Sequence, residues 1–252
     1  MQSATIATPV QTPDLHKASA PTSLEISDLH AFYGESHILH GVNLHVQEGE
    51  LVTLLGRNGA GRSTTLKAIM NMVGRRTGSI KIHGKEVIAS PAHHIARLGV
   101  GYCPEERGIF AALSVAENLM LPPVVCAGGM SLDDIYSMFP NLYERRFSQG
   151  TRLSGGEQQM LAMARILRTG AKLLLLDEIT EGLAPVIVQQ LAQVLLQLKE
   201  KGLTIILVEQ NFRFAAPLAD RHYLMEHGQI IEEIHSSQLT AKQALLNTCL
   251  GV

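Results

Sequence analysis

A glycine-rich loop at residues 56–64, GRNGAGRST, is the first stretch whose spacing could do chemistry. It follows the phosphate-loop pattern G-x-x-x-x-G-K-[ST] in its glycines and its serine, but position 62 is arginine instead of lysine. Glycines let the backbone wrap around phosphates and direct N–H groups at them, and Ser63 could offer its hydroxyl to Mg²⁺. An ordinary glycine-rich turn is the alternative. The loop residues are Gly56, Arg57, Asn58, Gly59, Ala60, Gly61, Arg62, Ser63 and Thr64.

A second stretch, LLLLDE at residues 173–178, places two acids at the end of an apolar run. Such a run predicts a buried strand, which would deliver Asp177 to the carboxyl edge of a sheet, where it can bind Mg²⁺, usually through water. Glu178 follows directly and is a candidate base that polarises an attacking water. A core strand that ends by chance at two acids is the alternative. Together with the glycine loop, the strand favours a nucleoside-triphosphate site.

A third stretch, LSGGEQQ at residues 153–159, lies shortly before the acidic strand. Ser154, Gly155 and Gly156 lead into a predicted helix, so backbone donors point at an anion. The stretch resembles the signature sequence of ATP-binding cassette (ABC) proteins, and an ordinary capped helix is the alternative. The resemblance implies that these residues bind the γ-phosphate of an ATP held by a second cassette. Two cassettes would then enclose two ATP molecules between them.

Four further segments match the same family. Tyr33, in HAFYGESHIL, matches the aromatic residue that stacks on adenine, although an aromatic at a strand end is more often part of a core. Glu105, in GYCPEERGIF, lies in the segment that senses the γ-phosphate, where most cassettes have glutamine. The segment EGLAP at residues 181–185 matches the loop that touches the facing cassette. Gln210, in LVEQN, lies in the switch loop, where most cassettes have histidine.

The segments PE-R, SGGEQQML, EGLAP and LVEQN together resemble one branch of the family, the second ATPase of branched-chain amino acid importers in bacteria and archaea. The urea and short-chain amide importers are similar. The resemblance covers about residues 24–252, and in this branch Glu105 and Gln210 are normal. Two departures remain, because Arg62 replaces lysine and Ile179 replaces the proline that usually follows the catalytic glutamate.

The resemblance implies ATP and Mg²⁺ as cofactors and Glu178 and Gln210 as catalytic residues. It also implies a second ABC ATPase subunit, or a second copy, as dimer partner, together with membrane-spanning permease subunits. A solute-binding protein would be an indirect partner, and the chain would lie at the cytoplasmic face of the bacterial inner membrane.

Two rival functions remain open at this stage. One is a nucleotide-binding regulatory cassette whose hydrolysis is weak because of Arg62. The other is a soluble cassette of repair, translation or cofactor assembly, which usually carries two cassettes, a long coiled coil or a nucleic-acid-binding patch, none of which is present in this sequence. A net charge of −2 gives no electrostatic argument for a nucleic-acid partner. The three cysteines share no short metal or redox spacing.

The pattern of apolar residues predicts an α/β fold for residues 24–252, preceded by a flexible tail, rich in Ser, Thr, Ala and Pro, at residues 1–23. We expect a P-loop NTPase core of mainly parallel sheet, an antiparallel β portion near the N-terminus and an inserted helical subdomain at about residues 90–165. The two apolar strands 172–178 and 204–209 enclose a helix and predict a parallel βαβ unit. Other predicted strands are 24–33, 43–56, 78–84, 100–103 and a hairpin at 221–233 that turns at His227-Gly228; other predicted helices are 63–73, 91–99, 114–121, 131–139, 141–146, 157–167, 185–202 and 237–250.

Overall fold

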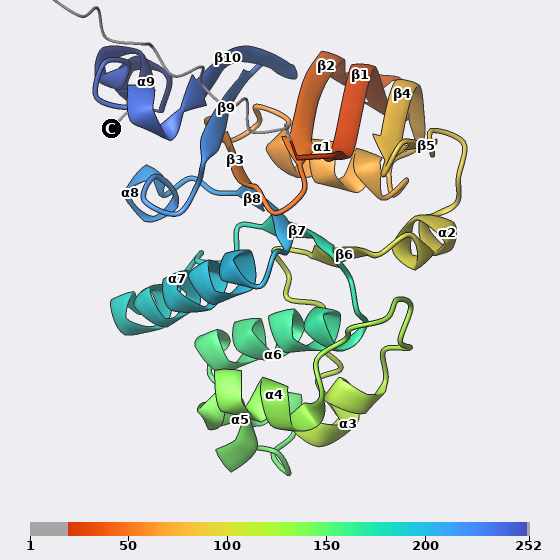
Figure 1. The fold of residues 1–252 in the computed structure, drawn as a ribbon, viewed down its shortest axis with the longest axis vertical. Helices are drawn as coiled ribbons and strands as arrows, with labels where there is room; N and C mark the ends of the chain where they lie inside the picture. Colours follow the sequence, from red (N-terminus) through yellow and green to blue (C-terminus); the bar gives the residue numbers. More distant parts are fainter. Residues whose placement is uncertain (1–19, 251–252) are drawn as a thin grey trace, which may run out of the picture.

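The strands of the protein form two sheets in the computed structural model, which describes residues 20–250 (Figure 1). The smaller sheet is antiparallel, with the strand order β2-β1-β4-β5. Its members are β1 (Thr22–Tyr33), β2 (Ser36–Gln47), β4 (Arg75–Ile82) and β5 (Lys85–Glu86). Most of the predicted tail at residues 1–23 lies outside the described residues, and β1 begins slightly earlier than the predicted start at residue 24.

The larger sheet has six strands in the order β10-β9-β3-β8-β7-β6. Every neighbouring pair is parallel except the hairpin of β9 and β10, which turns at His227-Gly228 as predicted. The strands are β3 (Leu51–Leu55), β6 (Val100–Cys103), β7 (Leu173–Asp177), β8 (Thr204–Val208), β9 (Arg221–Glu226) and β10 (Gln229–His235). A mainly parallel sheet beside an antiparallel one confirms the predicted α/β fold class.

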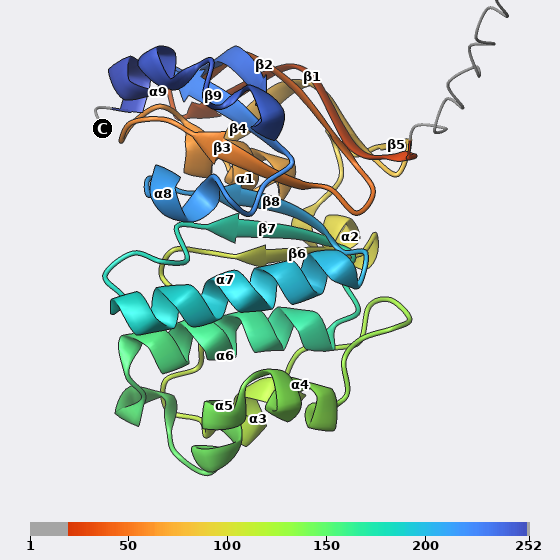
Figure 2. The same cartoon turned by 60° about the vertical axis from the view of Figure 1, so that its left-hand side comes forward.

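The central strands β3, β7 and β8 of the larger sheet are buried on both faces, which explains why they are almost continuously apolar, whereas the edge strand β10 is largely exposed. Along β7, Leu173 and Leu175 pack into a core shared with the antiparallel sheet and with α1 (Arg62–Ile69). Leu174 and Leu176 point the other way, into a core shared with α6 (Gly155–Arg168) and α7 (Pro185–Glu200). In Figure 2 these two long helices lie along one side of the sheet, and the small sheet lies on the other side.

Short helices pack on the outer side of α6, at the end of the molecule far from the antiparallel sheet (Figures 1 and 2). The helices that begin at Val115, Leu132 and Gly155 are each preceded by a serine. Its side chain accepts a hydrogen bond from the backbone amide of an acid three residues later, and the carboxylate of that acid accepts one from the amide of the serine. In residues 20–250, no helix is long and apolar enough to cross a membrane. The remaining helices are α2 (Ala92–Arg97), α3 (Val115–Met120), α4 (Leu132–Met138), α5 (Pro140–Glu144), α8 (Phe212–Ala215) and α9 (Gln243–Leu250), with 3₁₀ turns at Gly150–Arg152 and Ser236–Gln238.

Three predicted elements were wrong in extent. The single strand expected over residues 43–56 is two strands in different sheets, because the chain turns at Gly49, where φ is +75°. The helix expected over 63–73 ends at Ile69, and Asn71 follows with φ of +55°, a conformation that stops a helix. The helix expected over 237–250 begins only at Gln243, after the 3₁₀ turn.

Candidate functional site

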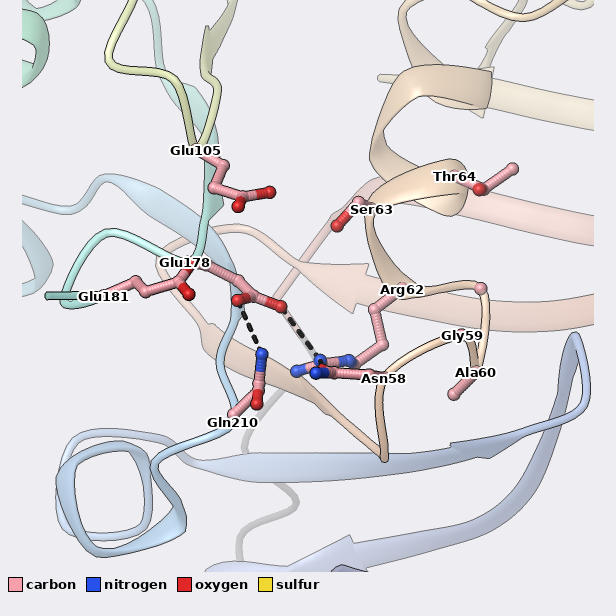
Figure 3. Close-up of a pocket in the computed structure, with 11 residues that line it drawn as sticks. Asn58, Gly59, Ala60, Arg62, Ser63, Thr64, Glu105, Glu178, Glu181 and Gln210 are labelled. Carbon is pink, nitrogen blue, oxygen red and sulfur yellow. Dashed lines mark hydrogen bonds and ion pairs between the residues drawn. The ribbon is translucent and has the colours of Figure 1, made fainter.

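A pocket of about 280 Å³ opens at the carboxyl ends of the parallel strands (Figure 3). The loop after β3 forms one wall, and the segments after β6, β7 and β8 form the other. Because parallel strands end at one edge of the sheet, residues far apart in the sequence meet here. The residues that line the pocket are Asn58, Gly59, Ala60, Gly61, Arg62, Ser63, Thr64, Glu105, Glu178, Glu181 and Gln210.

The loop needs its glycines for close approach and for backbone shape. A Cβ atom on Gly56 would lie 2.4 Å from the carbonyl oxygen of Met225 in β9, so only glycine fits beside that strand. Gly61 has φ of +104° and is the N-cap residue of α1, where it contributes no side chain that could bond to the first amides of the helix. The amides at the start of α1 are therefore available to an anion.

Ser63 and Asp177 connect the loop to the acidic strand. The Ser63 hydroxyl donates to Oδ1 of Asp177 at 2.8 Å, and the Tyr102 hydroxyl in β6 donates to Oδ2 at 3.1 Å. Burial raises the pKa of Asp177 above its usual range, although both hydrogen bonds oppose the rise. Tyr102 was not predicted to join the site, because only the sheet order places β6 beside β7.

This pair fits Mg²⁺, which takes oxygen ligands and is usually held by one or two side chains together with phosphate oxygens. Among the described residues, no group of three or more His, Cys, Asp and Glu side chains is arranged to hold a metal ion. A metal bound here would therefore depend on Ser63, Asp177 and the nucleotide.

Arg62 reaches across the pocket to Glu178. Its Nη2 atom lies 2.9 Å from Oε1 of Glu178 and 3.4 Å from Oδ1 of Asn58, and its side chain is only 4% exposed. The amide of Gln210 donates to the other carboxylate oxygen of Glu178 at 2.8 Å. Figure 3 shows Glu178 held between these two side chains. The Nη1 atom of Arg62 is buried and has no partner among the described residues, so it is a donor that a phosphate group could satisfy.

The pocket is rich in acids. Burial and the nearby carboxylates of Glu181 and Glu178 raise the pKa of Glu105 above its usual range. Arg62 is the only cation among the described residues that line the pocket. Glu181 also lines the pocket. The sequence predicted only that it belongs to a loop that touches the facing cassette, because the fold sets how the turn after Glu178 places Glu181. A bound triphosphate would add negative charge, which further favours a cation beside Asp177.

Behind the pocket, Glu209 is a buried acid. Its carboxylate accepts hydrogen bonds from the Thr180 hydroxyl at 3.0 and 2.9 Å and from the Thr180 amide at 3.1 Å. Burial raises the pKa of Glu209 to about 7, although the bonds from Thr180 oppose the rise. Sequence analysis did not select Glu209, because an acid after an apolar strand gives no signal for burial.

Several predicted site residues lie elsewhere. Tyr33 ends β1 and is 42% exposed, and Ser154, Gly155 and Gly156 begin α6; within the described part of the chain these four do not line the pocket. Gly156 packs closely on α7, because an added Cβ atom would lie 2.7 Å from Ile187. Gly56 and Arg57 belong to the loop but do not line the pocket either, so the structure of one chain brings together the remaining loop residues with Glu105, Asp177, Glu178 and Gln210.

Comparisons with known proteins agree with the geometry. A sequence model described as ABC transporter matches residues 39–181. The chain is 38% identical over 237 residues to BraG, the high-affinity branched-chain amino acid transport ATP-binding protein of Pseudomonas aeruginosa, covering 90% of this chain and 99% of that protein. It is 31% identical over 235 residues to LptB, the lipopolysaccharide export system ATP-binding protein of Escherichia coli, covering 91% and 97%. A solved dimer of an ATP-binding cassette bound to ADP and phosphate has a TM-score of 0.75 and 24% identity, covering 84% of this chain and 98% of that one.

Proposed function

The chain belongs to the ABC transporter family of ATPases, and we propose from this premise that it powers an importer for branched-chain amino acids or related small polar solutes. It is the ATP-binding, ATP-hydrolysing subunit of a transporter. The name of LptB describes an export system, so membership of the family does not set the direction of transport. The import proposal is supported by the higher identity to BraG over nearly its whole length and by the four segments that resemble the importer branch, which are PE-R, SGGEQQML, EGLAP and LVEQN.

The contact between Ser63 and Asp177 carries the part of the proposal that concerns ATP hydrolysis. These residues are 114 positions apart, yet their oxygens lie 2.8 Å from each other. A glycine loop, a helix start and a strand-end carboxylate meet at one point, as phosphoryl transfer with a metal requires. Ordinary packing gives no reason to place a serine hydroxyl against a buried carboxylate beside open backbone amides.

The loop from Gly56 to Thr64 holds the triphosphate, and the unpartnered Nη1 atom of Arg62 contributes a donor. Ser63 and Asp177 would hold Mg²⁺, which when bound neutralises charge on the phosphates. Glu178 accepts a proton from the attacking water, and Gln210 orients Glu178 through their 2.8 Å hydrogen bond. Tyr33 would stack on the adenine, and Glu105 would report the γ-phosphate to the helices that follow it.

A complete site would need two cassettes. Ser154, Gly155 and Gly156 lie at the start of α6, away from the pocket of their own chain, so we propose that they close the pocket of a facing subunit. The solved dimer with ADP and phosphate supports this arrangement only as a property of the fold. The facing subunit is either a second ABC ATPase or another copy of this chain.

The short helices beyond α6 are the proposed dock for the permease. They belong to the proposed helical subdomain of about residues 90–165 and expose large apolar side chains, which a partner would cover. We place the chain at the cytoplasmic face of the bacterial inner membrane, with a solute-binding protein as an indirect partner and no nucleic acid. The exposed apolar side chains of this region are Phe110, Met120, Leu121, Val124, Tyr143 and Phe147.

One observation favours a second function, a cassette that binds ATP but hydrolyses it slowly. Arg62 pairs with Glu178 at 2.9 Å, so one oxygen of the proposed base is occupied by an ion pair where the attacking water would need to bind. Steady-state hydrolysis by the assembled transporter separates a working ATPase from a regulatory cassette.

A substitution of the proposed base tests the main proposal. Glu178→Gln keeps the size of the side chain but removes the base, so we expect ATP binding to persist and hydrolysis to fall by about 100-fold or more. With Mg·ATP and its partner cassette, the variant should stay in the closed dimer on size-exclusion chromatography. Glu200→Gln, a carboxylate change at the end of α7, is the matched control and should behave as the wild type. A monomeric, fully active Glu178→Gln protein would contradict the assignment.

A further inference from the structure

Two neighbouring strand ends carry the proposed catalytic pair. Strands β7 and β8 are parallel partners, and Asp177 lies opposite Val208 at the last step of their ladder. Glu178 follows β7, and Gln210 follows β8 with one residue between. The 2.8 Å contact between the side chains of Glu178 and Gln210 therefore depends on the paths of the two segments that follow β7 and β8.

The backbone of Glu178 is in an unfavourable conformation. Its φ is +46°, in the left-handed region that residues other than glycine rarely adopt. Such a conformation persists only where the surroundings fix it, and it is concentrated at functional sites. On one side, the amide of Glu178 donates to the carbonyl oxygen of Val208 at 2.9 Å, which ties the residue to the end of β8.

A second connection joins Thr180, two residues after Glu178, to Glu209, one residue after Val208. The Glu209 carboxylate, 2% exposed, accepts from the amide and the hydroxyl of Thr180, whose exposure is 7%. Thr180 lies in the turn that Glu178 begins, where the amide of Glu181 donates to the carbonyl oxygen of Glu178 at 3.2 Å. Glu209 directly precedes Gln210. The hydrogen bonds between Glu209 and Thr180 therefore join the two segments that carry the catalytic pair, outside the lining of the pocket.

We propose that Glu209 and Thr180 are positioning residues, which hold the turn of Glu178 and the start of the Gln210 segment in the register that the reaction needs. This inference rests on the proposed role of Glu178 as base. Neither residue lines the pocket or is expected to touch the nucleotide. Their effect on the reaction acts through Glu178 and Gln210.

The cost of burying Glu209 supports a functional role. A carboxylate taken out of water destabilises the fold unless its hydrogen bonds offset the loss, and an apolar side chain of similar size would avoid that cost. Hydrolysis depends on placing the base within hydrogen-bond reach of water, and small displacements of such a group cost large factors in rate. The hydrogen bonds between Glu209 and Thr180 meet this requirement, because hydrogen bonds are directional whereas apolar packing is not.

The test removes the Thr180 hydroxyl with little change in shape. In the assembled transporter, Thr180→Val should lower kcat about tenfold and leave the KM for ATP within about twofold, because the phosphate loop is intact. Thr180→Ser keeps the hydroxyl and should restore most of the rate. The matched control is Thr53→Val in β3, where another buried threonine bonds to a titratable side chain, His222, at 2.7 Å but away from the pocket. Both valine variants should lower the melting temperature, and only Thr180→Val should lower kcat.

A double variant separates a positioning role from a general effect on the fold. Because Glu178→Gln already lacks the base that Thr180 would position, adding Thr180→Val to it should leave the residual rate unchanged. An unchanged kcat in Thr180→Val, an equal loss in Thr53→Val or a further tenfold loss in the Glu178→Gln background would each overturn the inference. A wild-type transporter without ATPase activity would instead overturn the proposed function on which the inference rests.

Discussion

Arg221 and Arg62 are both buried, but they lie at opposite ends of the parallel sheet and meet different surroundings. Arg221 begins β9, and its guanidinium contacts both Glu50 oxygens at 2.6 and 2.9 Å and Glu233 at 2.6 Å, with further bonds to His45 and Tyr223. Arg62 follows β3 at the other end, has the single acid Glu178 within ion-pair distance, and keeps one buried nitrogen without a partner in the described residues. An arginine whose hydrogen-bond donors all have partners within the protein suits stability, and an arginine with an unpartnered donor suits ligand binding.

The acids at the two ends differ in the same way. At the amino ends of the strands, Glu50 pairs with Arg221, and Asp220 pairs with Lys199 at 2.7 Å. At the carboxyl ends, Asp177, Glu178 and Glu209 lie close together, and Glu178 has φ of +46°. One end of the sheet therefore neutralises its charges within the chain. The other end has uncompensated negative charge, a strained backbone at Glu178 and an unpartnered hydrogen-bond donor on Arg62. A metal ion would bind the negative charge, and a triphosphate would accept from the donor.

The largest expected effect is on stability at the amino end. Arg221→Met should lower the free energy of unfolding by about 3–5 kcal/mol, because it leaves two carboxylates without their buried partner. Chemical denaturation measures this, and Arg62→Met is the matched control, expected to cost less than half as much because its single acid faces an open pocket. Equal losses for the two variants would remove the distinction between the two ends.

The second effect is a pH dependence at the carboxyl end. The pKa of Glu209 is raised to about 7 in the folded protein by burial, from 4.5 for an exposed glutamate. Below about pH 4.5 the group is protonated in both states and its contribution to stability is fully present; that contribution is lost as pH rises through about 7, because the unfolded chain ionises first. The wild type should therefore lose on the order of 2–3 kcal/mol relative to Glu209→Gln between pH 4.5 and 7.5.

Denaturation of both proteins across this pH range checks the prediction. His222, whose pKa burial lowers to about 4, loses its contribution as pH falls instead, and it cancels in the difference because both proteins contain it. A pH-independent difference would show that Glu209 has the same pKa in the folded and unfolded states, and would remove this distinction between the two ends of the sheet.

The smallest effect concerns Arg62 itself. Arg62→Lys should raise kcat about tenfold or more, on the order of 1.4 kcal/mol, with little change in ATP affinity. Lysine is a compact charge on a slim stem that fits inside the loop, whereas the planar guanidinium reaches across to Glu178. Steady-state ATPase assays with the partner cassette present compare the two versions. An unchanged or lower rate for the lysine version would show that the surroundings of Arg62 have adapted to it.

Much of the fold follows from local patterns. The apolar runs that became β7 and β8 predict buried parallel strands whatever lies around them, and serine followed by an acid three residues later predicts the start of α3, α4 and α6. The division of residues 43–56 into β2 and β3 was missed, because an apolar strand has the same pattern in either sheet.

The sequence by itself determined the chemistry that this protein can do, through the glycine loop, the paired acids Asp177 and Glu178, and the signature residues at the start of α6. Only the tertiary structure decided which groups meet: Tyr102 on Asp177, Arg62 and Gln210 on Glu178, and Thr180 on Glu209. The physical reason is range. Residue type and spacing act over a few positions of the chain, whereas burial, ion pairing and strain depend on neighbours that the order of strands brings from 29 to 116 residues away.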